Sequence, residues 1–461
     1  MSAIPEALVA TDPTNGKIIS KTPPLDALHL EQVMGQAVAA FPAWQELTFA
    51  ERGDLLLAVA SYMRENVETL APIMTLEMGK PIKEARAEVN KAALCAEHYA
   101  RHAESYLATE SINSDAQHSY VQYQPLGAVL GILPWNAPFW LAFRFCAPAL
   151  MAGNTCLMKH DPHVSGCAKA IIGAFDAVGA PPGVMQNLPL ANEQVESVIR
   201  DRRVQAVSFT GSSLAGAKVA AVAASEIKSA VLELGGSDPC IVLADANIEA
   251  AVKTVTISRM INAGQSCIAA KRIIVEAPVY DRFVELLRAS LAALKMGNPA
   301  DEMTDVGPIA RDDLRQALHR QVQESVKKGA RCLLGGVLPE GDGYFYPVTL
   351  LVDVTNDMAA GCEETFGPVA VVMKADNDEH ALKIANDSEF GLAGSVWTTS
   401  ARGEAIARRM ELGQVSINGI VKTDPRLPSG GIKRSGYGRE LGPHGIKEFV
   451  NAKQIWVGPA L

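Results

Sequence analysis

Two residues of this chain have the chemistry of a thiol-dependent oxidation. Cys267 ends the sequence Gly-Gln-Ser-Cys at 264–267, and Glu233 begins Glu-Leu-Gly-Gly at 233–236. A cysteine after small, flexible residues can present its sulfur to a carbonyl, and glycines beside a carboxylate let another molecule approach closely. Thiolate attack on an aldehyde gives a thiohemiacetal, loss of hydride leaves a thioester, and a water activated by the carboxylate releases an acid. The pair therefore predicts aldehyde oxidation, provided that a hydride acceptor and an oxyanion site are also present.

Composition and charge restrict the classes of protein to which the chain can belong. A chain of 461 residues is expected to form two or three packed domains, and an apolar fraction of 48% lets it bury a large core. The net charge of -9 and the lack of a Lys and Arg block argue against nucleic acid and anionic membranes as partners. Residues 1–10 show no signal peptide, and no run reaches about 18–20 apolar residues, so we expect a cytoplasmic protein.

The eight cysteines give no sign of a metal site. No two of them form a Cys-x-x-Cys pair, and none stands near a histidine at the spacing of zinc ligands, so we expect no bound metal. Cys146 and Cys240 lie in apolar stretches and are expected to be small buried hydrophobes. Cys267 differs from them because flexible and polar residues precede it.

The order of apolar segments predicts an α/β fold. Strand-like and helix-like segments alternate, as at residues 128–133, 155–159, 165–178, 206–210, 217–224, 272–275 and 280–294. Such alternation is typical of largely parallel sheets with helices on their faces. The loop from Gly211 to Gly216 joins a strand to a helix, as in sites that hold a dinucleotide pyrophosphate. Its spacing is not Gly-x-Gly-x-x-Gly, so an ordinary tight turn is favoured on this loop alone.

Other polar residues could bind a cofactor or an oxyanion, and each also has a plain structural explanation. Asn136 follows a buried strand and could donate its amide N–H to a developing oxyanion, or it forms an Asn turn. Glu364 and Phe366 suit ribose hydroxyls and a flat ring, or belong to a solvated acidic loop. Lys159 could contact a ribose or phosphate, or is a solvated strand end. The glycine-rich segment 429–442 is typical of a functional loop.

Five short motifs together carry a resemblance to a known family. They are Pro-Trp-Asn at 134–136, Phe-Thr-Gly-Ser at 209–212, Glu-Leu-Gly-Gly at 233–236, Gly-Gln-Ser-Cys at 264–267 and Glu-Thr-Phe-Gly-Pro at 364–368. With these motifs in this order, almost the whole chain resembles the NAD(P)-dependent aldehyde dehydrogenase superfamily.

The resemblance implies a role for each motif. Cys267 would be the nucleophile, Glu233 the general base, and Asn136 would form the oxyanion hole with the backbone N–H of Cys267. The implied cofactor contacts are Trp135, Lys159, Gly211, Ser212, Glu364 and Phe366. The cofactor would be NAD or NADP. Many NAD-preferring relatives carry a glutamate three residues after the position of Lys159, and here Pro162 stands there. We therefore expect both cofactors to work, with a weak lean to NAD.

The resemblance also implies an aldehyde dehydrogenase-like fold in three parts. A Rossmann-type cofactor domain would span 1–106 and 125–235, and an α/β catalytic domain 236–434. A small β oligomerisation arm would come from 107–124 and 446–461, and the apolar residues of this tail suggest burial in a homodimer or homotetramer.

Arg144 is the candidate for substrate selection. It lies among apolar residues eight positions after Asn136, and on one helix this spacing would aim both residues at the same cavity. A buried guanidinium needs an anion, either a substrate carboxylate or a protein carboxylate. The pattern is similar to the succinate-semialdehyde dehydrogenases, which implies an aldehyde with a distal carboxylate. A general aliphatic or aromatic aldehyde dehydrogenase, a CoA-acylating enzyme and a catalytically silent relative are the alternatives.

Overall fold

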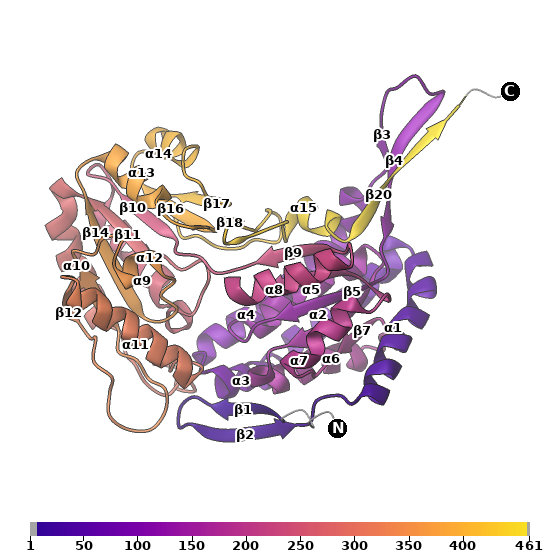
Figure 1. Cartoon of the computed structure of the whole chain (residues 1–461), viewed down its shortest axis with the longest axis horizontal. Helices are drawn as coiled ribbons and strands as arrows, with labels where there is room; N and C mark the ends of the chain where they lie inside the picture. Colours follow the sequence, from indigo (N-terminus) through magenta and orange to yellow (C-terminus); the bar gives the residue numbers. More distant parts are fainter. Residues whose placement is uncertain (1–6, 459–461) are drawn as a thin grey trace.

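The chain folds around two largely parallel β-sheets, which lie side by side in Figure 1 with helices around them. The computed structural model describes residues 7–458. Each sheet has an apolar core on both of its faces. Strands of such doubly covered sheets are largely apolar, and every residue of β5 and β6 is buried.

The first sheet has the strand order β19-β9-β8-β5-β6-β7. Its strands are β5 (Ala128–Leu133), β6 (Thr155–His160), β7 (Met185–Asn187), β8 (Val204–Thr210), β9 (Ser229–Glu233) and β19 (Gly436–Tyr437). All pairs are parallel except β19 with β9. The accompanying helices are α1 (Ala27–Glu46), α2 (Phe49–Glu65), α3 (Val67–Met78), α4 (Ile82–Tyr106), α5 (Pro138–Met151), α6 (Ser165–Ala177), α7 (Asn192–Arg200) and α8 (Ser213–Ser225).

The second sheet has the order β12-β13-β14-β11-β10-β16-β17, parallel except for β12. Its strands are β10 (Pro239–Val242), β11 (Arg272–Glu276), β12 (Arg331–Leu334), β13 (Thr349–Val352), β14 (Val369–Ala375), β16 (Ala393–Trp397) and β17 (Gln414–Ile417). Its helices are α9 (Ile248–Met260), α10 (Tyr280–Ala292), α11 (Asp312–Lys327), α12 (Ala359–Cys362), α13 (Asp378–Asn386) and α14 (Ser400–Ala407).

The chain crosses between the two sheets directly after Glu233. Strand β9 ends at Glu233 and β10 begins at Pro239, so residues 234–238 lead from the first sheet to the second. A hairpin of β1 (Leu8–Asp12) and β2 (Lys17–Thr22) lies near the N-terminus, and a short pair joins β15 (Phe390–Gly391) to β18 (Ile432–Lys433). Where the chain passes from one sheet to the other, side chains from both sheets can meet.

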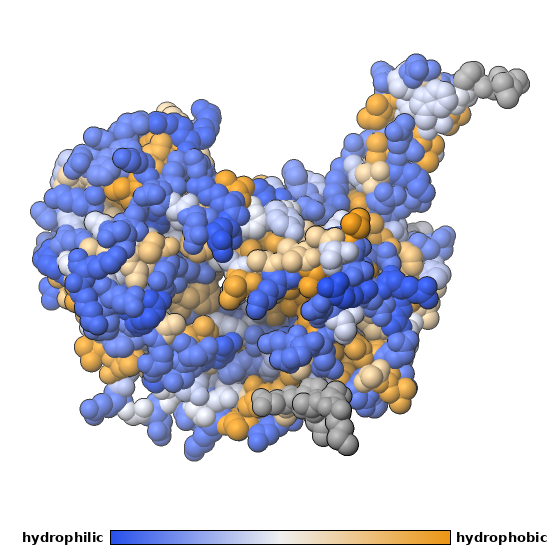
Figure 2. Space-filling model, in the orientation of Figure 1, coloured by the Kyte–Doolittle hydropathy of each residue, from blue (hydrophilic) through white to orange (hydrophobic). Residues whose placement is uncertain are grey.

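A third, antiparallel sheet projects from the body as an arm (Figure 1). It consists of β3 (Glu110–Ser111), β4 (His118–Pro125) and β20 (Val450–Val457), and α15 (Gly442–Lys447) leads into it. Figure 2 shows orange, apolar residues among blue ones on this arm, where Ile112, Trp456 and Val457 are exposed. Exposed apolar surface of this kind often marks an interface.

The predicted arm and domains can be compared with these sheets. The segments 107–124 and 446–461 contain the arm strands, although residues 459–461 lie outside the described part. The predicted domain limits stay predictions, and they left out β19, which extends the first sheet. Within residues 7–458, no helix has the length and apolar character needed to cross a bilayer.

The prediction for Arg144 assumed that Asn136 and Arg144 lie on one helix, and this assumption is wrong. Helix α5 begins at Pro138, a residue suited to the first turn of a helix, so Asn136 lies in the loop before α5 and not on it. Both residues nevertheless line one cavity.

Candidate active site

Two cavities meet at Cys267. The helix-side cavity has a volume of about 280 Å³ and is lined by α4, α5 and the loop at 420–423. The sheet-side cavity has a volume of about 220 Å³ and lies at the ends of β8 and β9. Asn136, Leu141 and Cys267 line both, so a molecule in either cavity can reach the sulfur.

The loop before Cys267 has an unusual backbone. In the 3-10 turn at Ile261–Gly264, Asn262 and Ala263 have φ values of 54° and 53°, and Gly264 has a φ of +74°. Left-handed residues other than glycine are uncommon and collect at functional sites. A Cβ on Gly264 would collide with the carbonyl of Gly367. Tertiary packing therefore fixes the path of this loop.

Amide side chains hold the loop beside Asn136. Asn262 Nδ2 donates to the main-chain oxygens of Asn136 and Gln265, at 2.9 and 3.1 Å. Gln265 Oε1 accepts from the backbone N–H of Ala310 at 2.9 Å. The amide of Asn136 donates to Gln265 O at 3.2 Å, two residues before the nucleophile candidate. Asn136 thus lies next to Cys267, as an oxyanion donor must, and its role stays a prediction.

The Cys267 thiol is half-buried and protonated at neutral pH. Burial raises its pKa to about 11, although the charges of Lys271 and Arg144 favour the thiolate. Because the thiolate is the nucleophile, a base must remove the proton before or during attack.

Glu233 can be that base. It ends β9, is 4% exposed, and lines the sheet-side cavity together with Cys267. Its Oε2 accepts from Arg144 at 3.2 Å, while Oε1 has no hydrogen-bond partner among residues 7–458. Burial raises the Glu233 pKa to about 7, with Arg144 opposing the shift and Glu440 adding to it. A carboxyl with a pKa near neutrality suits general base catalysis.

Arg144 lies between two carboxylates. It is 3% exposed, and its Nη2 forms ion pairs with Glu233 and Glu440. Burial by itself lowers the Arg144 pKa, but the charges of Glu440 and Glu233 outweigh it and the pKa is raised. The pairing with protein carboxylates, left open above, is present. A substrate contact by Arg144 stays a prediction.

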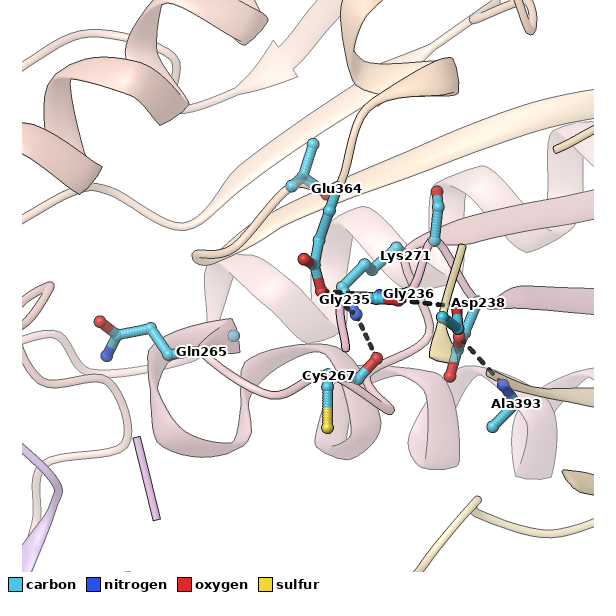
Figure 3. A network of polar contacts seen from close by, with 12 residues as sticks. Gly235, Gly236, Asp238, Gln265, Cys267, Lys271, Glu364 and Ala393 are labelled. Carbon is cyan, nitrogen blue, oxygen red and sulfur yellow. Dashed lines mark hydrogen bonds and ion pairs between the residues drawn. The ribbon is translucent and has the colours of Figure 1, made fainter. Parts of the chain in front are cut away.

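Glu364 takes part in a network behind Cys267 (Figure 3). Its Oε1 accepts from the backbone N–H of Gly236 at 3.1 Å and pairs with Lys271 at 3.3 Å. Lys271 also donates to the main-chain oxygen of Cys267. A Cβ on Gly235 would collide with the Glu364 carboxylate, which explains the glycine there. The network connects the sheet-side cavity to the backbone of Cys267.

The sheet-side cavity has features that fit a dinucleotide. Ser212 is the N-cap of α8, and Gly211 precedes it, so a helix N-terminus faces the cavity and can hold a phosphate. Trp135 and Phe366 form an edge-to-face pair with ring centroids 5.8 Å apart, which offers a surface for a flat ring. Thr210 Oγ1 is buried without a hydrogen-bond partner in the described chain and can serve a ligand.

Lys159 is the one predicted cofactor residue outside the lining of this cavity. It is 5% exposed near the end of β6 and donates to Asn192 Oδ1 at 3.2 Å. Burial lowers its pKa. A ribose contact by Lys159 stays a prediction.

Sequence reasoning missed several site residues. Glu440, Lys271 and Lys91 were not singled out, because each stands outside the family motifs and acquires its place only through packing. Glu440 does fall in the glycine-rich segment that was interpreted as a functional loop, and this was a usable signal. Within residues 7–458, no group of three or more His, Cys, Asp or Glu side chains is arranged to hold a metal ion.

Comparisons with known proteins agree with this architecture. Residues 2–455 match the sequence model of the Aldehyde dehydrogenase family. A Synechocystis protein named probable succinate-semialdehyde dehydrogenase (NADP(+)) is 45% identical over 98% of this chain and 100% of that protein. Succinate semialdehyde dehydrogenase (NAD(P)+) Sad of Escherichia coli is 44% identical over 97% of each. The crystal structure of succinic semialdehyde dehydrogenase from Streptococcus pyogenes with NADP+ aligns with a TM-score of 0.96 at 33% identity, covering 98% of this chain and 100% of that one.

The chain therefore belongs to the aldehyde dehydrogenase family. The predicted fold is confirmed, and so is the predicted class of enzyme, an NAD(P)-dependent oxidoreductase that acts on aldehydes.

Proposed function

We propose that this enzyme oxidises succinate semialdehyde to succinate with NADP+ or NAD+. The observation that carries the proposal is the charge around the helix-side cavity, which opens onto Cys267. Four basic side chains line it against two acidic ones; they are Lys80, Lys91, Arg144 and Lys422, and Glu84 and Glu88. A short aldehyde with a carboxylate at its far end complements such a cavity. The names of the two relatives, which match this chain over nearly their full length, support the same substrate.

In the proposed reaction Glu233 acts twice. Its unpaired Oε1 takes the thiol proton of Cys267, and the thiolate attacks the aldehyde carbon. The Asn136 amide and the Cys267 backbone N–H donate to the resulting oxyanion. The adduct loses hydride from its carbon and becomes a thioester; NAD(P)+, which the sheet-side cavity would hold, would be the hydride acceptor. Glu233 passes the thiol proton to solvent and then removes a proton from the water that attacks the thioester. The acid leaves as the C–S bond breaks, and the Cys267 thiolate takes the proton back from Glu233.

For the cofactor we infer that NADP+ is accepted. No carboxylate stands at position 162 to repel a 2′-phosphate, and the Synechocystis and Escherichia coli relatives are both named with NADP or NAD(P). The weak lean to NAD has no support from these relatives. The cytoplasmic location and the homodimer or homotetramer stay predictions.

Initial rates with succinate semialdehyde and butanal, each with NAD+ and NADP+, test the proposal. We expect kcat/KM for succinate semialdehyde to exceed that for butanal by at least about tenfold, the worth of one favourable charge contact. Equal values would reject the semialdehyde and leave a general aliphatic aldehyde dehydrogenase. If the rate requires CoA, the enzyme acylates CoA and the hydrolytic role of Glu233 is wrong.

A further inference from the structure

The basic residues of the helix-side cavity differ in what they contact. Arg144 is paired with Glu233 and Glu440, and Lys80 is paired with Glu88 and donates to Asn136 O at 2.9 Å. These two cations already have protein carboxylates as partners.

Lys91 has no such partner. Its ammonium donates to Thr423 Oγ1 at 2.9 Å and lies over the ring of Trp140, 4.1 Å from the centroid. Among residues 7–458, no carboxylate lies within ion-pairing distance of it. Burial, with the repulsion of Arg144, lowers the Lys91 pKa to about 8. Glu88 and Asp424 favour the charged form from beyond ion-pairing distance, so the half-buried ammonium has a hydroxyl and a ring in contact but, within residues 7–458, no carboxylate paired with it.

The contacts of Lys91 fix the position of its charge. The residue comes from α4, Trp140 from α5 and Thr423 from the loop after β17, so three separate elements meet around one ammonium. Cys267 lines the same cavity, which has a volume of about 280 Å³. This volume is close to that of the smallest small-molecule sites, about 300 Å³. A short chain with an aldehyde at one end and an anion at the other suits this arrangement.

We propose that Lys91, with the hydroxyl of Thr423, binds the distal carboxylate of the substrate. This inference rests on the proposed function, because it names the group that recognises the semialdehyde. Arg144 is then a positioning residue: its charge is shared by two carboxylates, and it fixes the orientation of Glu233.

The test compares variants at four positions, which are Lys91, Arg144, Lys83 and Lys422, by the ratio of kcat/KM for succinate semialdehyde to that for butanal. Lys91→Met should lower this ratio by about 10- to 100-fold, as expected when one partner of a desolvated charge pair is removed. Arg144→Leu should lower both rates together and leave the ratio within about threefold, because it disturbs Glu233. Lys83→Met is the matched control, since Lys83 also lies on α4 but pairs with Asp305 and does not line the cavity. Its ratio should be that of the wild type.

A second measurement does not depend on turnover. Succinate should compete with the semialdehyde, and Lys91→Met should raise its inhibition constant by a similar factor, whereas Lys91→Arg should recover part of the affinity.

Each outcome decides between distinct alternatives. A wild-type ratio near one rejects the proposed function itself. A high wild-type ratio that survives in Lys91→Met overturns the role of Lys91 alone. If Lys422→Met or Arg144→Leu collapses the ratio while Lys91→Met does not, that residue is the carboxylate anchor instead.

Discussion

Glu440→Gln provides a sharp test of how the general base is tuned. Glu440 and Glu233 both contact Nη2 of Arg144, and the repulsion of Glu440 helps to raise the Glu233 pKa. The substitution keeps the shape of the side chain but removes its charge. Arg144 would then have Glu233 as its single carboxylate partner, so the Glu233 pKa should fall.

The magnitude follows from the shared contact. Because both carboxylates touch one nitrogen, their oxygens are at most about 6 Å apart, where two charges repel by roughly 3 kcal/mol at an effective dielectric constant of about 20. About 1.4 kcal/mol corresponds to one pKa unit, so the repulsion at this separation corresponds to about two units. Arg144 relaxes toward the remaining partner, which also lowers the Glu233 pKa, and we expect a downward shift of about one unit or more.

The assay is single-turnover release of acid, quenched at intervals between about pH 5.5 and pH 9. Deprotonated Glu233 is the active form, so the wild-type rate should rise with pH through about 7. In Glu440→Gln the same rise should occur about one unit or more lower, with a smaller plateau because a weaker base activates water less well.

Glu448→Gln is the matched control. Glu448 accepts from the backbone N–H of Arg439 at 2.8 Å and does not pair with Arg144, so its pH profile should match that of the wild type. An unchanged or upward-shifted profile in Glu440→Gln would refute the idea that Arg144 divides its charge between the two carboxylates.

Three further predictions concern the reaction and the cofactor. Cys267→Ala should abolish both cofactor reduction and acid release, because no adduct forms; more than about 1% of the wild-type rate would contradict this. Glu233→Gln should slow the single-turnover burst of reduced cofactor, because the thiol loses its base, and should slow acid release as well, so that a thioester accumulates and can be detected by mass spectrometry of the intact chain. A burst at the wild-type rate would mean that Glu233 activates the water but not the thiol. Pro162→Glu should raise KM for NADP+ by about tenfold or more through repulsion of the 2′-phosphate, with KM for NAD+ little changed. Equal damage to both cofactors would place residue 162 away from the adenosine ribose.

The local motifs were predictable because their chemistry is local. Glu233 stands at a strand end beside glycines, and Cys267 follows a flexible run, so both could be recognised from neighbours in the chain. The alternation of strands and helices likewise reflects short-range periodicity, and the α/β class followed from it.

The carboxylate partners of Arg144 could not be predicted from its neighbours in the chain. Apolar neighbours indicated that it is buried and needs an anion, but Glu233 and Glu440 reach it from positions 89 and 296 residues away in the chain. The assumption that Asn136 lies on the same helix as Arg144 was wrong, because α5 begins at Pro138, two residues after Asn136. Lys91 gave no signal at all, because a lysine in a helix is usually solvated.

The sequence by itself determined the α/β fold class and the family to which the chain belongs, and it predicted the reacting groups. These depend on residue type and on spacing over a few positions. Only the tertiary structure decided which charges are neutralised. Packing of α4, α5 and the C-terminal loops against the ends of β8 and β9 pairs Arg144 with two carboxylates and, within the described residues 7–458, leaves Lys91 without one. An ion pair is set by distance in space and by the water excluded around it, and neither quantity is a property of the order of residues.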